Sequence, residues 1–249
     1  MEEKIFMTGE LGKVCGVLHT IKGAKEIVII IHGLSSNKDT SAVQTAQILN
    51  ELGIDAIRID LDNQGESELD FQTGISIPNY IQQVETTLNY CKAQRYKEIS
   101  LIGTSYGGLV AFATVLSHPE IKRLLMRAPV VDYEEHANWL YGKEKVKEII
   151  KEGFMEYYSP KKKTSFKINA DFITKSYPFS MKKNADKVKI PTLIIQGDND
   201  EQVNYKDAIK VISTFPNAEL KLIQGADHAL SVNGDYSQGQ NVLRDFFGK

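Results

Sequence analysis

Short apolar runs, each ended by Gly, Pro or Asp, recur along the chain between longer amphipathic stretches. Six of these runs are rich in Ile, Val and Leu and cover residues 26–33, 54–60, 98–103, 121–129, 190–197 and 218–225. Continuous apolar runs of this length are typical of strands buried on both faces, as in a parallel sheet covered by helices. The first twenty or so residues instead resemble an antiparallel hairpin added at one edge.

Helical spacing of apolar residues fills the intervals between these runs. Residues 40–53 place apolar side chains near one face and end at Gly53, which suits a left-handed residue after a helix. The stretch 106–120 is apolar on nearly every side, so we expect it to be a central, buried helix. Further helices are expected over 77–94, 204–215 and 235–249. Because strand and helix alternate, the pattern predicts an α/β fold with a mainly parallel sheet.

One long interval, residues 132–186, breaks this alternation. No strong buried strand is expected there, and a lysine-rich helical piece is followed by aromatic and polar segments. Connections of this length are usually functional. We therefore interpret residues 132–186 as a lid (cap) inserted into a core formed by residues 1–131 and 187–249. Its aromatic residues either pack the lid onto the core or line a substrate pocket, and Trp139 is the candidate for the wall of that pocket. The run Lys161–Lys163 is interpreted as a solvated loop.

Composition narrows the classes of function. A chain of 249 residues can form one substantial core, and its net charge of −2 gives no basic field that would hold nucleic acid or an anionic membrane. No apolar run approaches the ~20 residues that a membrane span needs. The acidic first residues lack the apolar region of a secretory signal, and Cys15 and Cys91 are expected to be free thiols, so a cytoplasmic location is predicted. A homodimer is left open.

The clearest chemical signal is GTSYG, residues 103–107, at the junction of an expected strand and an expected helix. This is the G-x-S-x-G pattern in the context that gives it meaning. A strand that turns directly into a helix forces Ser105 into a positive-φ conformation that holds its hydroxyl above the sheet. Gly103 and Gly107 approach other backbone so closely that a Cβ would clash. The motif predicts a nucleophilic serine.

A serine nucleophile needs a base, and the chain offers five histidines. His228, in GADHALS, follows the last expected strand, where a loop at the carboxyl edge of the sheet can reach Ser105. His32 ends a strand, His118 ends the helix that follows Ser105, and the other two are His19 and His136. We therefore predict His228 as the base.

The orienting acid is less sharply defined by the residues alone. The strand that ends at Gly197 is followed by Asp198, Asp200 and Glu201, and any of these satisfies the chain order of serine, acid and histidine. Asp227 is a weaker candidate because side chains adjacent in sequence rarely meet. The choice among the other three stays open at this point.

These segments together resemble the α/β-hydrolase-fold serine hydrolases over almost the whole chain. IHGLSSNKDT is similar to the His-Gly oxyanion loop of that family, and GDND and GADH are similar to its acid and base loops. The segment RIDLDNQGES departs from the family pattern, since Asn63 and Gln64 replace the usual Arg-Gly or Gly-His. Within the family, the chain is most similar to small bacterial feruloyl/cinnamoyl-type carboxylesterases, whose substrates are aryl-acyl esters.

The resemblance implies specific roles. It makes Asp200, the fourth residue of G-x-x-D, the acid, and it makes the backbone N–H groups of Leu34 and Tyr106 the oxyanion donors. It gives His32 a structural role. The expected reaction is hydrolysis of a small-molecule carboxylic ester through an acyl-enzyme on Ser105, with no metal and no organic cofactor.

Two other classes of function stay open beside this hydrolase. One is a thioesterase, peptidase or acyltransferase of the same fold. An aminopeptidase would need acidic lid groups to hold the substrate ammonium, and such groups are present at Glu134, Glu135, Glu152 and Glu156. The other class is a non-catalytic binding protein, which would have no need of serine, acid and histidine together.

Overall fold

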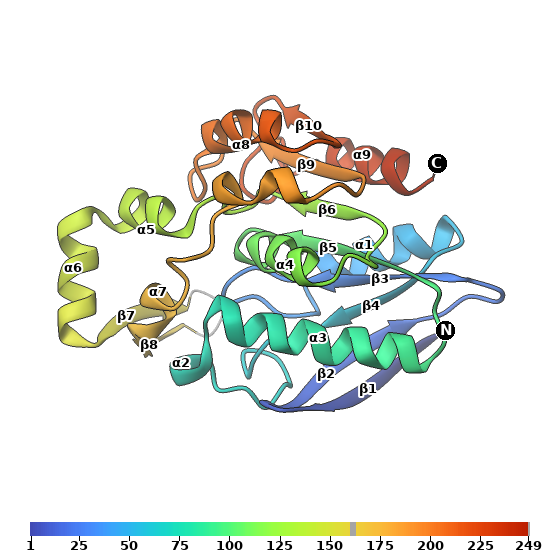
Figure 1. The fold of residues 1–249 in the computed structure, drawn as a ribbon, viewed down its shortest axis with the longest axis horizontal. Helices are drawn as coiled ribbons and strands as arrows, with labels where there is room; N and C mark the ends of the chain where they lie inside the picture. The colour runs from blue at the N-terminus through green and yellow to red at the C-terminus, as the bar shows by residue number, and fades with distance from the viewer. Residues whose placement is uncertain (160–162, 249) are drawn as a thin grey trace.

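The computed structural model describes residues 1–159 and 163–248, so Lys161 and Lys162 of the predicted solvated loop lie outside the described residues. An eight-stranded sheet in the order β1-β2-β4-β3-β5-β6-β9-β10 forms its centre (Figure 1). Its strands are β1 (Glu2–Gly9), β2 (Gly12–His19), β3 (Glu26–Ile31), β4 (Asp55–Ile59), β5 (Glu98–Thr104), β6 (Leu124–Arg127), β9 (Thr192–Gly197) and β10 (Ala218–Ile223).

The directions of the strands match the predicted α/β architecture. Six strands run parallel to one another, namely β4, β3, β5, β6, β9 and β10. Strand β2 pairs antiparallel with β4 on one side and with β1 on the other. The edge hairpin and the mainly parallel sheet are therefore confirmed. Burial on both faces holds for β3, β4 and β9. The predicted burial is wrong for β10. This strand is largely exposed because it lies at the edge of the sheet and has a neighbouring strand on one side alone.

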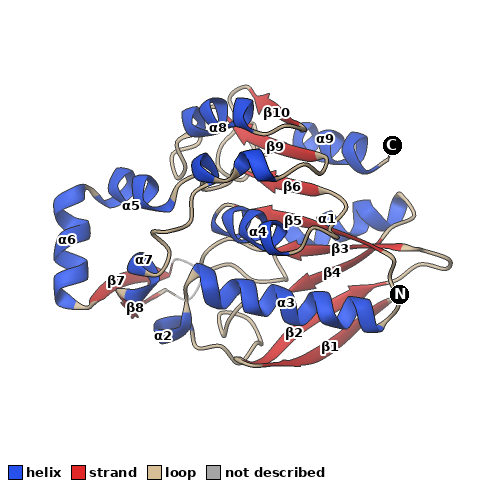
Figure 2. Cartoon of the chain, in the orientation of Figure 1, coloured by secondary structure: helices blue, strands red, loops and turns tan. Residues whose placement is uncertain are grey.

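Helices cover both faces of the sheet (Figure 2). The helices α1 (Ser41–Glu51) and α9 (Ser237–Phe247) pack over one apolar core, and α3 (Ile77–Ala93), α4 (Tyr106–Ser117) and α8 (Tyr205–Val211) over a larger one on the opposite face. Helix α4 is buried from Tyr106 to Val115, as predicted. The short helices α2 (Phe71–Gly74) and η3 (Ile212–Thr214) complete the core. Both cysteines are buried and free, which confirms that prediction.

Residues 132–186, called the inserted segment below, lie beyond the carboxyl ends of the parallel strands (Figure 1). They contain a two-stranded antiparallel sheet that the apolar pattern did not predict. Their elements are α5 (Tyr133–Tyr141), α6 (Lys143–Glu152), β7 (Phe154–Ser159), β8 (Thr164–Asn169), α7 (Asp171–Thr174) and η1 (Met181–Lys183), and η2 (Ala185–Lys187) follows at the boundary with the core. Across the described ranges, no helix combines the length and the apolar character needed to cross a bilayer.

Candidate active site

Ser105 occupies the turn between β5 and α4 with φ 56° and ψ −122°. This confirms the positive-φ conformation predicted from GTSYG. A Cβ on Gly103 would lie 2.3 Å from the Gly107 carbonyl oxygen, and one on Gly107 would lie 2.2 Å from the His32 carbonyl oxygen. Both glycines are therefore required by close backbone contacts, which hold the strained serine at the carboxyl edge of the sheet.

His228 and Asp200 come together from the loops that follow β10 and β9. The His228 Nδ1–H group donates to Asp200 Oδ2 at 2.8 Å. The same Oδ2 accepts from Gln196 Nε2 at 2.9 Å, while Oδ1 accepts from the backbone N–H groups of Gln202 at 2.8 Å and Val203 at 2.9 Å. Four donors therefore surround one buried carboxylate and fix its orientation toward the imidazole.

The environment of Asp200 keeps it ionised. Burial by itself raises the pKa of this carboxyl, but the hydrogen bond and charge of His228 and the amides of Val203 and Gln202 lower it, and the pKa lies below its ordinary value. An ionised carboxylate against Nδ1–H leaves Nε2 as the nitrogen available to a second partner.

Of the other acidic candidates, Asp198 and Asp227 have different partners, and Glu201 is exposed. Asp198 accepts from the Gly225 backbone N–H group at 2.6 Å, so its carboxylate closes a turn. Asp227 accepts from the amides of Ala229 and Ser231 in its own loop. Of the acidic candidates, Asp200 is the one that the structure brings to His228.

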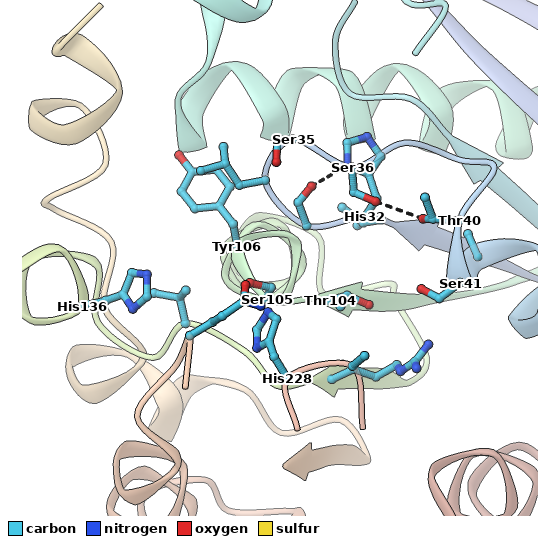
Figure 3. Close-up of a pocket in the computed structure, with 18 of the residues that line it drawn as sticks. His32, Ser35, Ser36, Thr40, Ser41, Thr104, Ser105, Tyr106, His136 and His228 are labelled. Carbon is cyan, nitrogen blue, oxygen red and sulfur yellow. Dashed lines mark hydrogen bonds between the residues drawn. The ribbon is translucent and has the colours of Figure 1, made fainter. Parts of the chain in front are cut away.

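Ser105 and His228 line the same cavity. The imidazole of His228 is directed toward the serine in Figure 3. Within residues 1–159 and 163–248, no hydrogen bond joins the Ser105 hydroxyl to this imidazole. Hydrogen bonds between a nucleophile and its base are often long in unliganded enzymes and shorten when substrate binds, so a missing bond does not exclude His228 as the base.

His32 has the bracing position that the resemblance implies. Its Nδ1–H donates to the Gly33 carbonyl oxygen at 2.7 Å, and its Nε2 accepts from the Leu61 backbone N–H group at 3.0 Å. Since an amide N–H can only donate, Nε2 must be the unprotonated nitrogen. His19 and His118 are also engaged elsewhere, with Arg58 and Glu85 respectively.

The two backbone N–H groups proposed as oxyanion donors border the cavity. Leu34 lies in the loop after β3, and Tyr106 is the first residue of α4. In the part of the chain that the structure describes, neither N–H group donates to another protein group. The loop that carries Leu34 is held by Lys38, whose N–H and Nζ bind the buried carboxylate of Asp60 at 2.7 Å and 2.9 Å.

The cavity has a volume of about 390 Å³, within the range of about 300–1,000 Å³ typical of small-molecule sites. The inserted segment contributes to its lining with Tyr133, His136, Leu140, Tyr141 and Tyr157. Tyr157 also hydrogen-bonds Ser35 in the loop that carries Leu34, which ties the inserted segment to that loop.

Trp139 is not brought to the cavity. It is 47% exposed and stacks on His136, with ring centroids 6.4 Å apart, while the adjacent Leu140 and Tyr141 line the wall. The four glutamates considered for binding an ammonium group, Glu134, Glu135, Glu152 and Glu156, are likewise outside the described lining.

His136 is a cavity residue that the sequence analysis left without a role. Burial, together with the charge of His228, lowers the pKa of His136 to about 4. The imidazole is therefore neutral near pH 7 and can both donate and accept a hydrogen bond toward a ligand. Its spacing of three residues from Tyr133 in a helix was the available signal, since it places both on one face.

One cluster of potential metal ligands lies away from this cavity. Cys15, Asp60 and Glu66 offer ligand atoms within 4.8 Å of one another. The ammonium group of Lys38 already bonds Asp60 at 2.9 Å and Glu66 at 2.8 Å. The cluster is therefore explained by an internal ion pair that holds the loop carrying Leu34.

Comparisons with known proteins agree with this fold. Human monoacylglycerol lipase ABHD6 is 21% identical over 243 residues, covering 84% of this chain and 71% of the lipase. A putative esterase/lipase of Haemophilus influenzae is 24% identical over 226 residues, covering 81% of this chain and 76% of the relative. Est1E of Butyrivibrio proteoclasticus, solved with ferulic acid bound, is similar in structure with a TM-score of 0.85 at 21% identity, covering 97% of each chain.

The family assignment rests on a match to a family model over more than half of the chain. The model of the family described as serine aminopeptidase, S33, matches residues 22–178. The structural neighbours confirm the α/β-hydrolase fold that the sequence predicted. The chain belongs to the serine aminopeptidase S33 family of α/β-hydrolases.

Proposed function

We propose that the protein hydrolyses carboxylic esters with Ser105 as nucleophile, His228 as general base and Asp200 as the group that orients the base. The observation that carries the proposal is the 2.8 Å hydrogen bond between His228 and an ionised Asp200, beside a serine held at φ 56° in the same cavity. A serine hydroxyl is a poor nucleophile by itself. In this arrangement His228 would serve as the base that removes its proton.

The reaction begins when His228 Nε2 takes the proton of Ser105 as the hydroxyl oxygen attacks the ester carbonyl carbon. The hydrogen bond from Nδ1–H to Asp200 holds the ring in the tautomer that can accept this proton. The positive charge that then develops on the imidazole is balanced by the carboxylate, whose lowered pKa keeps it ionised.

The tetrahedral intermediate carries a negative oxygen that the N–H groups of Leu34 and Tyr106 would bind. Each such donor typically contributes about 3 kcal/mol to lowering the barrier. His228 next gives its proton to the leaving alcohol, and the carbonyl re-forms as an acyl-enzyme on Ser105. Water, activated by the same imidazole, releases the acid and restores the hydroxyl.

We also propose that the inserted segment acts as a lid over the substrate. It supplies Tyr133, Leu140, Tyr141 and Tyr157 to the cavity, a lining that suits an aryl or short alkyl group. Ferulic acid in Est1E is an example of such a group in a relative of the same fold.

The family name raises the alternative of an aminopeptidase, which the lining disfavours. The ammonium group of a peptide N-terminus needs a carboxylate partner when it leaves water. The described lining contains no Asp or Glu, and its one permanent charge is the cation Arg127. An ester without an ammonium group fits this cavity better.

The proposal is tested with purified protein and 4-nitrophenyl esters of acetate, butyrate and octanoate, with methyl ferulate and alanine 4-nitroanilide alongside. We expect esters to give the highest kcat/KM and the anilide the lowest. Ser105→Ala should reduce kcat by about 10⁴-fold or more. The matched control is Ser117→Ala, an exposed serine at the far end of α4. Retained hydrolysis in Ser105→Ala, or a preference for the anilide, would contradict the proposal.

A further inference from the structure

Arg127 lies beside the candidate nucleophile although it is distant from it along the chain. It is the last residue of β6 and pairs with Thr104 across the parallel sheet. Its carbonyl oxygen accepts the backbone N–H group of Ser105 at 2.8 Å. The Arg127 side chain therefore starts one strand away from Ser105, at the same edge of the sheet.

The charge of Arg127 has no carboxylate partner in the part of the chain that the structure describes. Its recorded hydrogen bond runs from Nη1 to Thr45 Oγ1 at 3.3 Å. By contrast, Arg58 pairs with Asp39, and Arg123 pairs with Glu26 at 2.5 Å. Arg127 is partly buried, and this burial lowers the pKa of its guanidinium. A partly buried guanidinium that no described carboxylate pairs with indicates a ligand of negative charge.

The helix end beside Arg127 offers hydrogen-bond donors to the cavity. Helix α1 begins at Ser41, has no acidic residue in its first turn, and receives no side-chain hydrogen bond at its N-cap. Ser41 and Ala42 line the same cavity as Arg127, so the positive end of the helix faces it. The Thr45 hydroxyl donates to the Ser41 carbonyl oxygen, which leaves its own oxygen to accept from Arg127 and position the guanidinium.

A second cavity of about 260 Å³ extends the space around this charge. It shares Ser41, Thr104, Arg127 and His228 with the first cavity, but neither oxyanion residue lines it. Figure 3 shows Ser41 and Thr104 on the opposite side of Ser105 from His136. Since His228 must face the leaving oxygen to protonate it, the space beyond His228 receives the alcohol portion of the ester.

We propose that Arg127, with Ser41 and the N-terminus of α1, binds a carboxylate or phosphate group on the alcohol portion of the substrate. The preferred substrates are then anionic esters whose negative charge leaves with the alcohol. This inference rests on the proposed ester hydrolysis at Ser105 and adds the chemical class of the leaving group. The planar guanidinium fork suits both kinds of oxyanion.

The test compares 4-carboxyphenyl acetate and 4-acetoxyphenyl phosphate with neutral 4-carbamoylphenyl acetate. We expect wild-type kcat/KM to be at least 10-fold higher for one of the two anionic esters, and either preference supports the proposal. Arg127→Gln should lower the ratio of anionic to neutral kcat/KM at least 10-fold, and Arg127→Lys should lower it less. The control Arg95→Gln, an exposed arginine before β5 at the opposite edge of the sheet, should keep the wild-type ratio.

The outcomes separate this inference from the proposed function. If the wild type hydrolyses none of the three esters, ester hydrolysis itself is refuted. If it hydrolyses the neutral ester equally well, or if Arg127→Gln keeps the ratio within twofold, the anion site alone is refuted. Should Arg127→Gln not fold, inhibition of wild-type hydrolysis of the neutral ester decides. 4-Hydroxybenzoate should inhibit at least 10-fold more strongly than 4-hydroxybenzamide, and equal inhibition would overturn the proposal.

Discussion

Replacing Asp200 with Asn tests how the carboxylate works, because the two side chains have nearly the same shape. Each oxygen of Asp200 accepts two hydrogen bonds: Oδ1 from the amides of Gln202 and Val203, and Oδ2 from His228 and Gln196. An asparagine must place its NH₂ group at one of these positions. At either position it faces two donors, and it can accept from neither.

The size of the effect follows from those contacts. With NH₂ toward His228, the imidazole loses its acceptor and Nδ1–H is no longer the favoured tautomer, a loss that lowers kcat by about 10⁴-fold in a serine protease. With NH₂ toward the two amides, the loop after β9 must move instead. In both cases one buried donor and one partly buried donor lose their partner. The buried donor alone costs about 1–3 kcal/mol, so the free energy of unfolding should fall by at least about 1–3 kcal/mol.

The assay measures kcat for 4-nitrophenyl acetate and the urea midpoint for wild type, Asp200→Asn and the control Asp198→Asn. Asp198 is the neighbouring carboxylate that binds the Gly225 amide instead of the imidazole. We expect Asp198→Asn to keep kcat within a few-fold of wild type. A kcat above one tenth of wild type in folded Asp200→Asn, or a larger loss in Asp198→Asn, would refute the role assigned to Asp200.

Three further predictions follow from other contacts. Gly107→Ala places a Cβ 2.2 Å from the His32 carbonyl oxygen, so thermal unfolding should show a loss of about 1–3 kcal/mol, and unchanged stability would contradict the close approach. Tyr157→Phe removes the hydrogen bond to Ser35, so kcat/KM should fall several-fold with little change in Tm, whereas an unaltered kcat/KM would show that this tie is unimportant. The pKa of His136 is about 4 in the fold against an ordinary value of 6.5, so between these pH values the unfolded chain binds the extra proton and stability declines as pH falls. Urea unfolding at pH 7 and 4.5 should show His136→Phe losing about 2–3 kcal/mol less than wild type, and equal losses would oppose this.

Much of the core could be predicted because its signals are local. Runs such as 26–33 are apolar enough to require burial on both faces, and the glycines around Ser105 report a backbone contact that no other residue permits. The position of Asp200 came from the G-x-x-D resemblance, and its geometry separates it from Asp198.

The inserted segment was harder to predict because its elements are not buried on both faces. Strand β8 is mostly exposed and carries no continuous apolar run, so the hairpin with β7 left no clear pattern. Trp139 and Leu140 are adjacent on α5, and the rotation of that helix over the sheet, which depends on tertiary packing, decides which of them reaches the cavity. Arg127 ends an apolar strand, and the sequence around it does not indicate that no carboxylate of the described residues pairs with it.

The rate of covalent modification by a fluorophosphonate tests most directly whether Ser105 is activated by His228. Intact mass and peptide mapping should show a single adduct on Ser105 in the native protein, and none after unfolding in urea. We predict that His228→Gln slows this modification by about 10³-fold or more while Asp198→Asn leaves it unchanged. An adduct on a different residue, or a rate that does not depend on His228, would contradict the account.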